Sequence, residues 1–512
     1  MSLPPTLARS WRRSAGVAGL LTGAAQAHPD TPFLSDRFGS AWSYAETEVR
    51  ARAFAAWLRH QGIGRGDRVA VVAQNRAEIV VAVFGCALVG AVFVVLNPKL
   101  RPKGLAAILA QAEPSAIVFD SSTAELVAEG GAEMARLLEI GGPAWEEALS
   151  AEPPESEWEG CDLDPASLVF TSGSTGTPRG VVLSQDNITF VVGAIQARLG
   201  YRPGDMVGVF LPLAFDYGLY QIFLAAQAGA RLHLGDPSEV GPRLPRTLRE
   251  AGVTVLPGVP SVCAALIALG RRGPLGLPAL HAVTNTGERL PPSYIEELRR
   301  LLPGVEIFVM YGLTECKRVS ILLPRESADH ADSVGRALDG TEVYAVDAGG
   351  NRLPPGETGE LVVKGRHVAL GYWRAPEETA RRFRKRAPES AVELFTGDAG
   401  SVDAGGFLRF SARSDDWIKH RGYRISPLEI ENEACEIAGI VEAALLQRES
   451  DETLHLFVTV SGGGADPAAL QAELTEVLEA AKVPDHIRVL DEMPKSINGK
   501  IDRKALVERL AD

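Results

Sequence analysis

The sequence has few of the features that mark several large protein classes. Its 512 residues include five cysteines, which are widely spaced and form no CxxC pair. This pattern argues against structural zinc and a disulfide framework, and it fits a reducing cytoplasm. The formal net charge of -13 argues against a nucleic-acid partner, and no apolar run reaches the ~20 residues that a membrane span needs. We therefore expect a cytoplasmic protein with neither partner.

The N-terminal stretch "ARSWRRSAGVAGLLTGAAQAHPD" (8–30) is similar to a signal peptide, with two adjacent arginines and an AQA tripeptide. Gly and Thr interrupt its apolar part, however, and the rest of the chain has a cytosolic composition. We interpret residues 17–28 as an amphipathic first helix that ends before Pro29.

The length exceeds that of one ordinary core, so the sequence predicts at least two domains. Residues 66–98 read as strand, helix, strand, and similar units continue to about residue 312. This pattern predicts an α/β fold with helices covering mostly parallel sheets. We expect a large N-terminal domain (1–414) with a small β-barrel at about 335–411, and a small, mobile α+β C-terminal domain (415–512).

A loop rich in glycine and hydroxyl side chains lies between two apolar strands in "LVFTSGSTGTPRGVVLS" (168–184). Small residues of this kind expose backbone N–H and hydroxyl donors, which phosphate oxygens need. The spacing differs from a Walker A loop, and Arg179 is its only cation. A flexible turn is the alternative, but the many hydroxyls favour phosphate binding.

A lone carboxylate, Asp216, stands inside the apolar run "PLAFDYGLY" (212–220). A charge in such a setting is costly unless it is solvated or paired. The segment is therefore either a surface turn or part of a pocket in which Asp216 meets a cation.

Six motifs occur in an order that resembles the adenylate-forming superfamily, which includes acyl-CoA synthetases, stand-alone adenylation enzymes and luciferases. They are "TSGSTGTPRGV" (171–181), "YGLTE" (311–315), "GETGELVVKGRHVALGYW" (356–373), "FTGDAG" (395–400), "ARSDDWIKHRGYRISPLEIE" (412–431) and "PKSINGKIDRKAL" (494–506). The resemblance covers nearly the entire chain. The departures are Ala412, where Gly is usual, and Arg179, where Lys is common.

The resemblance implies an AMP-forming ligase that uses ATP and Mg²⁺. The substrate carboxylate attacks the α-phosphate and pyrophosphate leaves, so positioning and cationic stabilisation dominate catalysis. Glu315 would ligate Mg²⁺, Thr314 would bond the α-phosphate, Tyr311 would stack on adenine, and Asp398 with Arg413 would hold the ribose. The residues implied for the β- and γ-phosphates are Thr171, Ser172, Gly173, Ser174, Thr175 and Gly176. The alternatives are an ordinary turn aspartate for Asp398 and a core aromatic ending a strand for Tyr311, and the ordered set of motifs favours the functional interpretation.

The same resemblance makes Lys500 a catalytic residue that bridges the substrate carboxylate and the α-phosphate. A solvated C-terminal lysine is the alternative. Asp415 would be the hinge about which the C-terminal domain rotates. After that rotation residues 417–424 would face the site, and a phosphopantetheine thiol would attack the adenylate.

The substrate is expected to be an amino acid. In amino-acid-activating members of the superfamily an Asp follows Phe at the position of Asp216 and pairs with the substrate ammonium, which resolves the cost of burying both charges. Lys317 and Arg318 would lie near the far end of the substrate, although a solvated surface pair is an equal alternative. The other implied substrate-binding residues are Phe215, Tyr217 and Gly287. The combination resembles stand-alone enzymes that load β-amino acids onto carrier proteins in macrolactam polyketide biosynthesis.

The expected acceptor is a separate acyl carrier protein, because no GGxS carrier motif follows the tail. The basic run "RRFRKR" (381–386) would attract an acidic carrier, although a solvated helix end is the simpler interpretation. The alternative function is an acyl- or aryl-CoA ligase that uses free coenzyme A. A regulatory protein without catalysis is disfavoured by the intact set Glu315, Asp398, Arg413 and Lys500.

Overall fold

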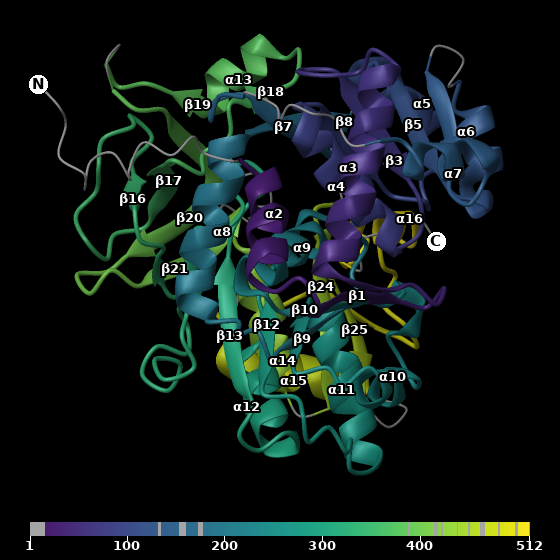
Figure 1. Cartoon of the computed structure of the whole chain (residues 1–512). Coiled ribbons are helices and arrows are strands. Elements are labelled where there is room, and N and C mark those ends of the chain that lie inside the picture. The colour runs from purple at the N-terminus through teal and green to yellow at the C-terminus, as the bar shows by residue number, and fades with distance from the viewer. Residues whose placement is uncertain are drawn as a thin grey trace, which may run out of the picture. The chain divides into compact units, whose positions relative to one another are not determined.

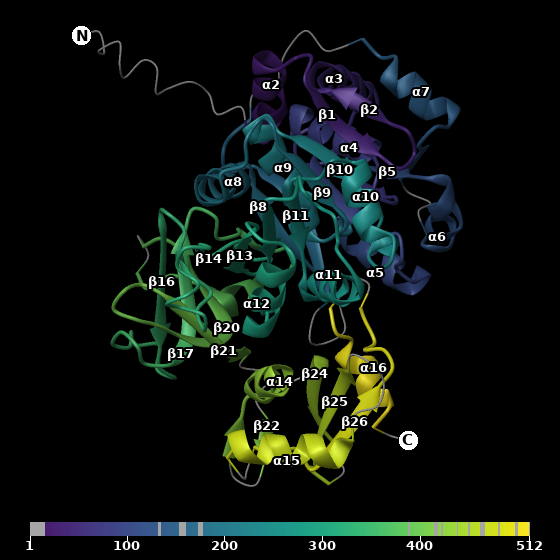
Figure 2. The same cartoon turned by 90° about the horizontal axis from the view of Figure 1, so that it is seen from below.

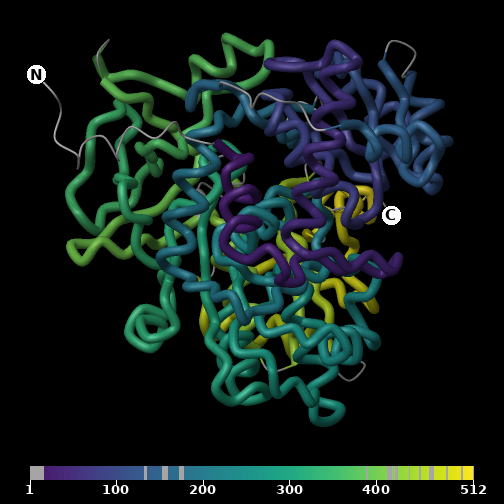
Figure 3. Tube along the Cα trace, in the orientation of Figure 1, coloured from purple at the N-terminus to yellow at the C-terminus, as the bar shows by residue number. Residues whose placement is uncertain are grey.

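The computed structural model describes residues 16–131, 135–152, 160–172, 178–387, 390–413, 418–420, 423–437, 439–448, 451–460, 466–479, 482–496 and 500–510 (Figure 1). The chain forms two compact units. The first unit comprises Met1–Gly235 and Ala369–Thr379, and the second comprises Asp236–Val368 and Ala380–Asp512. The chain therefore leaves the first unit, returns to it for one short segment, and leaves it again (Figure 3).

The first unit contains a seven-stranded sheet in the order β18-β8-β7-β4-β3-β5-β6. Strands β3 to β7 run parallel, whereas β8 pairs antiparallel with both β7 and β18. Their bounds are β3 Arg68–Val72, β4 Val92–Leu96, β5 Ala116–Phe119, β6 Arg136–Glu139, β7 Pro165–Ser172, β8 Pro178–Ser184 and β18 Gly371–Tyr372. The associated helices are α3 Tyr44–His60, α4 Ala77–Val89, α5 Pro102–Ala112, α6 Ala124–Glu129 and α7 Pro143–Leu149. The predicted strand–helix–strand unit at 66–98 is thus confirmed.

Local signals in the sequence explain where these helices begin and end. Ser43 and Glu46 form a reciprocal capping box at the start of α3. Gly90 adopts the left-handed conformation directly after α4, which ends the helix at low cost.

Four further strands of the first unit are neighbours in the order β9-β10-β1-β2. They are β9 Met206–Val209, β10 Arg231–Leu234, β1 Pro32–Asp36 and β2 Ala41–Ser43, and the first three run parallel. The helices of this part are α2 Ala18–Ala27, α8 Gln185–Leu199 and α9 Asp216–Ala228. The helix predicted before Pro29 is confirmed as α2, which packs on α9.

The second unit begins with the parallel strands β11 (Val255–Gly258), β12 (Ala282–Asn285) and β13 (Glu306–Tyr311). Strands β14 (Ser320–Leu322) and β15 (Arg336–Ala337) continue this sheet antiparallel. The helices are α10 Leu244–Glu250, α11 Pro260–Arg272 and α12 Pro292–Leu301. Because β11, β12 and β13 are parallel, the loops that follow them meet at one edge of the sheet, where α/β proteins bind ligands.

The predicted change to short antiparallel strands after residue 341 is confirmed. The five strands are β16 Thr341–Val346, β17 Gly359–Gly365, β19 Phe383–Arg384, β20 Glu393–Val402 and β21 Leu408–Arg413, and α13 (Pro376–Arg382) precedes β19. The long strand β20 pairs with β17, β19 and β21. Its register with β21 places Asp398 opposite Arg413.

The C-terminal part of the second unit contains a three-stranded sheet, β24-β25-β26, with helices beside it (Figure 2). The bounds are β22 Ile418–His420, β23 Tyr423–Ile425, α14 Pro427–Glu436, β24 Ile440–Gln447, β25 Leu454–Val460, α15 Pro467–Val477, β26 His486–Leu490 and α16 Arg503–Glu508. Apolar residues of α14, α15, β24 and β25 form its core. The predicted helices and the strand pair between them are confirmed.

The predicted α/β fold class is confirmed, while the boundary between residues 414 and 415 stays a prediction. Asp415 and its immediate neighbours lie outside the described residues. Within the described ranges, no helix has the length and apolar character required to cross a membrane.

Candidate active site

The segment "PLAFDYGLY" leads into helix α9, which begins at Asp216, and its first residues are buried or half-buried, so it is not a surface turn. Asp216 is the first residue of the helix and is half-buried, while Tyr217 and Tyr220 are buried. The partial positive charge of a helix N-terminus stabilises a carboxylate at this position. Gly218 is required here, because a Cβ on it would lie 2.6 Å from the carbonyl oxygen of Pro212. The Phe215 and Tyr217 rings make an edge contact at 6.3 Å.

Asn75, which the sequence analysis missed, holds this segment in place. Its side-chain amide donates to the carbonyl oxygens of Leu211 (2.8 Å) and Gly235 (2.9 Å), and its Oδ1 accepts from the N–H of Leu213 at 2.9 Å. The side chain is buried. The only signal in the sequence was the position of Asn75 directly between a predicted strand and a predicted helix. Asparagine is so common at such positions that this does not predict a particular role.

The predicted phosphate loop connects the antiparallel strands β7 and β8. Their register pairs Thr171 with Arg179 and Ser172 with Pro178. The Arg179 guanidinium forms an ion pair with Glu378 at 2.7 Å, so its orientation is fixed within the first unit. The loop residues Gly173, Ser174, Thr175 and Gly176 and the side chain of Ser172 lie outside the described residues.

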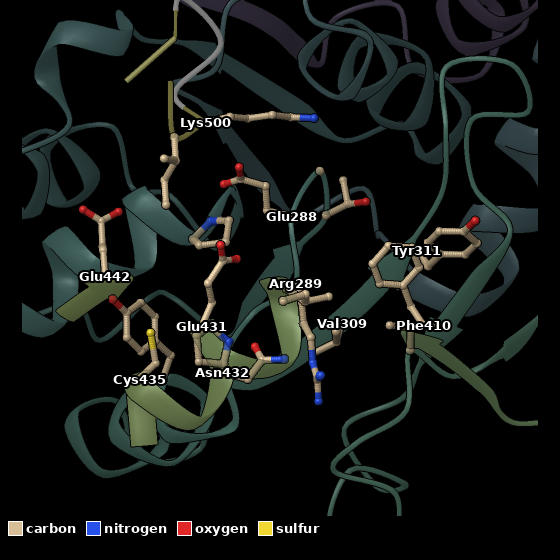
Figure 4. Close-up of a pocket in the computed structure, with 18 of the residues that line it drawn as sticks. Glu288, Arg289, Val309, Tyr311, Phe410, Glu431, Asn432, Cys435, Glu442 and Lys500 are labelled. Carbon is tan, nitrogen blue, oxygen red and sulfur yellow. The ribbon is translucent and has the colours of Figure 1, made fainter. Parts of the chain in front are cut away.

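The second unit contains a cavity of about 370 Å³ at the carboxyl ends of its parallel strands (Figure 4). This volume lies within the range of small-molecule sites. Its walls include four residues predicted from the sequence: Gly287, Tyr311, Asp398 and Lys500. Gly287 has a φ of 94°, a left-handed conformation that glycine adopts without strain. Residues separated by more than 200 positions in the sequence therefore line one site.

Tyr311 and Asp398 form a buried pair on one wall of this cavity. The Tyr311 hydroxyl donates to Asp398 Oδ2 at 2.6 Å, and the ring lies 5.7 Å from that of Phe410. Burial, and then the neighbouring Asp398 charge, raise the pKa of Tyr311 well above its ordinary value. Arg413 stands opposite Asp398 in the strand register, and its side chain lies outside the described part. The alternative of Asp398 as an ordinary turn residue is wrong, because Asp398 is buried within strand β20.

Glu315 and Thr314 follow in the loop after β13. Glu315 is buried, and the Arg382 guanidinium lies 3.6 Å from its Oε1. Among the described residues no group of three or more His, Cys, Asp and Glu side chains could hold a metal. Mg²⁺ in nucleotide sites is held by one or two carboxylates and by substrate phosphates. A single carboxylate such as Glu315 fits this mode of binding.

Lys317 and Arg318 are buried, so the alternative of a solvated surface pair is wrong. They are 6% and 7% exposed, and the Arg318 guanidinium donates to the hydroxyl of Thr286. Lys317 has a φ of 61°, and its carbonyl oxygen would lie 1.9 Å from a Cβ on Gly312. Glycine at position 312 therefore allows the loop to fold back and bury both cations.

Lys500 lies near the C-terminus and lines the cavity on the opposite side from Tyr311 (Figure 4). The N–H of Ser496 donates to the carbonyl oxygen of Lys500 at 2.7 Å, and Lys495 and Ile501 pair as an isolated antiparallel β-bridge. The alternative of a freely solvated tail lysine is wrong, since Lys500 lines the cavity.

Comparison with known proteins identifies the family. A model of the AMP-binding enzymes matches residues 21–373, and a model of their C-terminal domain matches residues 429–500. The chain belongs to the AMP-binding enzyme family. The predicted adenylate-forming superfamily and, at the level of the family, the predicted AMP-forming ligase are confirmed.

Three relatives of this AMP-binding enzyme illustrate the family's range. Pyochelin synthetase PchF from Pseudomonas aeruginosa is 33% identical over 490 residues, which are 93% of this chain and 26% of that protein. VinN, solved alone and with L-aspartate, is 37% and 36% identical with TM-scores of 0.72 and 0.71, covering 78% of this chain and 99% of VinN. ATP-bound MatB from Rhodopseudomonas palustris is 25% identical with a TM-score of 0.84, covering 97% of this chain and 99% of MatB.

The AMP-binding enzyme described here spans only 6% to 36% of the length of the curated relatives that it matches. The VinN structure, in contrast, is covered almost completely. The family and the ATP-bound relative support the predicted use of ATP.

Proposed function

We propose that this protein adenylates the carboxylate of an amino acid with ATP, releases pyrophosphate, and transfers the aminoacyl group to a thiol. The observation that carries this proposal is the cavity that brings together Tyr311, Asp398 and Lys500. A buried hydrogen-bonded carboxylate suits a ribose, and a lysine opposite it suits the charge that develops on the α-phosphate and the attacking carboxylate.

The nucleotide would contact residues on strands and residues on the loops that follow them. Asp398 would accept the ribose hydroxyls with help from Arg413, Tyr311 would stack on adenine, and Thr314 would bond the α-phosphate. Glu315 would hold Mg²⁺, which neutralises phosphate charge when it is bound. The glycine- and hydroxyl-rich loop after Thr171 would hold the remaining phosphates.

For the substrate we propose an amino acid with two carboxylates, of which L-aspartate is the simplest test compound. Asp216 offers a negative charge at the start of α9, which suits an ammonium group. Lys317 and Arg318 are buried cations, which suit a second carboxylate. The similarity to VinN, whose structure contains L-aspartate, supports this choice. The amino group of aspartate is in the β-position relative to one of its carboxylates, so the proposal includes the predicted β-amino acid.

ATP–pyrophosphate exchange with three matched acids tests this substrate. Succinate is aspartate without the amine, and β-alanine is aspartate without the α-carboxylate. We expect exchange with L-aspartate to exceed exchange with either by at least about 30-fold, because each analogue lacks one of the two charged groups that the proposed contacts recognise. Equal exchange with succinate would exclude recognition of the amine, and equal exchange with β-alanine would exclude recognition of the second carboxylate.

Variants of Asp216 test the assigned side chain directly. We expect Asp216→Asn to remove the preference for L-aspartate over succinate. Asp186→Asn is the matched control, because Asp186 also lies in the first turn of a helix, α8, of the same unit. A preference that persists in Asp216→Asn, or that Asp186→Asn removes to the same extent, would contradict the assignment.

The proposed acceptor is the phosphopantetheine arm of a separate acyl carrier protein. The run 381–386 gives this docking little support. The Arg384 guanidinium lies 4.1 Å from the Phe395 ring centre, and Arg386 forms an ion pair with Glu393 at 2.8 Å. Thioester formation is to be compared between a phosphopantetheine-bearing acyl carrier protein and coenzyme A. Transfer to coenzyme A at the faster rate would replace this proposal with a CoA ligase.

A further inference from the structure

Three carboxylates surround the segment that carries Lys500, and they come from different parts of the chain. Glu431 of α14 accepts hydrogen bonds from Arg503 at 2.6 Å and from the N–H of Leu445 at 2.7 Å. Glu442 of β24 forms an ion pair with Lys495. Glu288, the third, lies in the loop after β12 and lines the same cavity as Lys500 (Figure 4).

Two of these contacts are internal to the C-terminal part of the chain. Glu431, Glu442, Lys495 and Arg503 all lie between residues 427 and 510, so their ion pairs fix the Lys500 segment to its own sheet and helices. The hydrogen bond from the N–H of Asp502 to the carbonyl of Pro494, at 2.8 Å, closes the same segment. These contacts persist if the C-terminal part moves as a body.

Glu288 makes a contact of a different kind, because it belongs to the parallel sheet and not to the C-terminal part. Glu288, Lys500, Ile501 and Arg503 line the same cavity, and the Ile501 N–H and the Lys500 and Lys495 charges all act electrostatically on the Glu288 carboxylate. Burial raises the pKa of Glu288, and those cations oppose the rise. The carboxylate is therefore placed where the Lys500 segment meets the strands that carry Tyr311.

We infer that Glu288 is a positioning residue that holds the Lys500 segment over the cavity for adenylation, and that its contact breaks before thioester transfer. The inference rests on the proposed two-step function. A cavity-lining carboxylate that attracts the Ile501 N–H and Lys500 stabilises only the conformation in which Lys500 reaches the cavity. A bias toward one conformation helps the half-reaction that uses it and opposes the other.

The two half-reactions separate this role from a general structural one. We expect Glu288→Ala to lower ATP–pyrophosphate exchange by at least about tenfold, since small misplacements of catalytic groups have effects of this size or larger. Thioester formation from supplied aminoacyl-adenylate should be unchanged or faster. Glu288→Gln, which keeps an oxygen acceptor without the charge, should fall between wild type and Glu288→Ala.

Two further variants provide controls. Glu296→Gln removes the same charge from an exposed position on α12 and should leave both half-reactions unchanged. Tyr294→Phe removes the hydrogen bond from the Tyr294 hydroxyl to the carbonyl of Val441, a contact with the C-terminal part that does not involve Lys500. Its effect on exchange should be smaller than that of Glu288→Ala.

Hydrogen–deuterium exchange gives a readout that needs no activity. The Ile501 amide should exchange faster in Glu288→Ala than in wild type, while amides of β24 and β25 stay protected. Unchanged Ile501 protection, or equal losses in both half-reactions, would overturn the inference. If wild type shows no pyrophosphate exchange with any acid, the proposed function fails, whereas the Ile501 result still decides whether Glu288 holds this segment.

Discussion

The two sides of the cavity are built in different ways. On one side, Tyr311 and Asp398 are fixed by strand register and by a buried hydrogen bond of 2.6 Å. On the other side, Lys500 belongs to a short segment held by the ion pairs Arg503–Glu431 and Lys495–Glu442, and Glu288 lines the cavity beside it. Strand pairing resists rearrangement, whereas a few ionic contacts at a boundary are readily exchanged. The proposed two-step reaction would use such a fixed side for the nucleotide and a releasable side for the lysine.

The largest predicted effect is on the releasable side. Lys500→Ala should lower ATP–pyrophosphate exchange by about 10²–10³-fold, because it removes the charge that, in the proposed mechanism, stabilises the transition state. Lys504→Ala is the control, since Lys504 is an exposed lysine at the start of α16. Exchange within threefold of wild type in Lys500→Ala would show that the C-terminal segment has no catalytic role.

The next effect concerns the stability of the fixed side. Asp398→Ala leaves the buried Tyr311 hydroxyl without its acceptor and should lower the free energy of unfolding by about 1–3 kcal/mol. Adding Tyr311→Phe removes the hydroxyl as well and should recover part of this loss. Urea unfolding of both single variants and the double variant measures the coupling. Strictly additive losses would show that the hydrogen bond does not stabilise the fold.

Acidification should destabilise the antiparallel part of the second unit through His367. This histidine is fully buried, and burial lowers its pKa from 6.5 to about 4. Between these values the unfolded chain binds a proton that the folded chain does not, so stability falls as the pH decreases. The loss between pH 6.5 and pH 5 should be about 2 kcal/mol.

Urea unfolding at pH 7 and pH 5 tests this assignment. His367→Gln should reduce the pH dependence by that amount, and His60→Gln, at an exposed histidine, should not. An unchanged pH dependence in His367→Gln would show that His367 is not the group responsible.

The smallest effect is expected inside the C-terminal part. Lys495→Gln breaks the ion pair with Glu442, whose two side chains are 25% and 18% exposed, and should cost less than about 1 kcal/mol of stability. ATP–pyrophosphate exchange should fall only a few-fold, because the ion pair of Arg503 with Glu431 and the proposed contact of Glu288 still hold the Lys500 segment. Lys482→Gln breaks the comparable ion pair with Glu429 and serves as the control. A decrease as large as that of Lys500→Ala would mean that Lys495 itself acts in catalysis.

Much of this arrangement was predictable from the sequence. The alternating strand and helix segments predicted the parallel strands, and the ordered motifs predicted that Tyr311, Asp398 and Lys500 belong to one site. The burial of Lys317 and Arg318 was not predictable, because it depends on the loop that folds back at Gly312.

The contacts that position the site were also hidden in the sequence. Glu431 and Arg503 are 72 residues apart in the sequence. Nothing in the sequence around Glu288 predicts that it lies close to Ile501 in the fold. Such pairs form only when the tertiary structure brings separate elements together, so neither periodicity nor motif spacing reports them.

The affinity for ATP in two variants, measured by calorimetry without any acid substrate, tests the contrast between the two sides most directly. If the nucleotide side is fixed independently, Lys500→Ala binds ATP within about twofold of wild type, and Asp398→Ala binds it at least about tenfold more weakly, as expected for a lost charged hydrogen bond. Wild-type affinity in Asp398→Ala together with a large loss in Lys500→Ala would contradict the account.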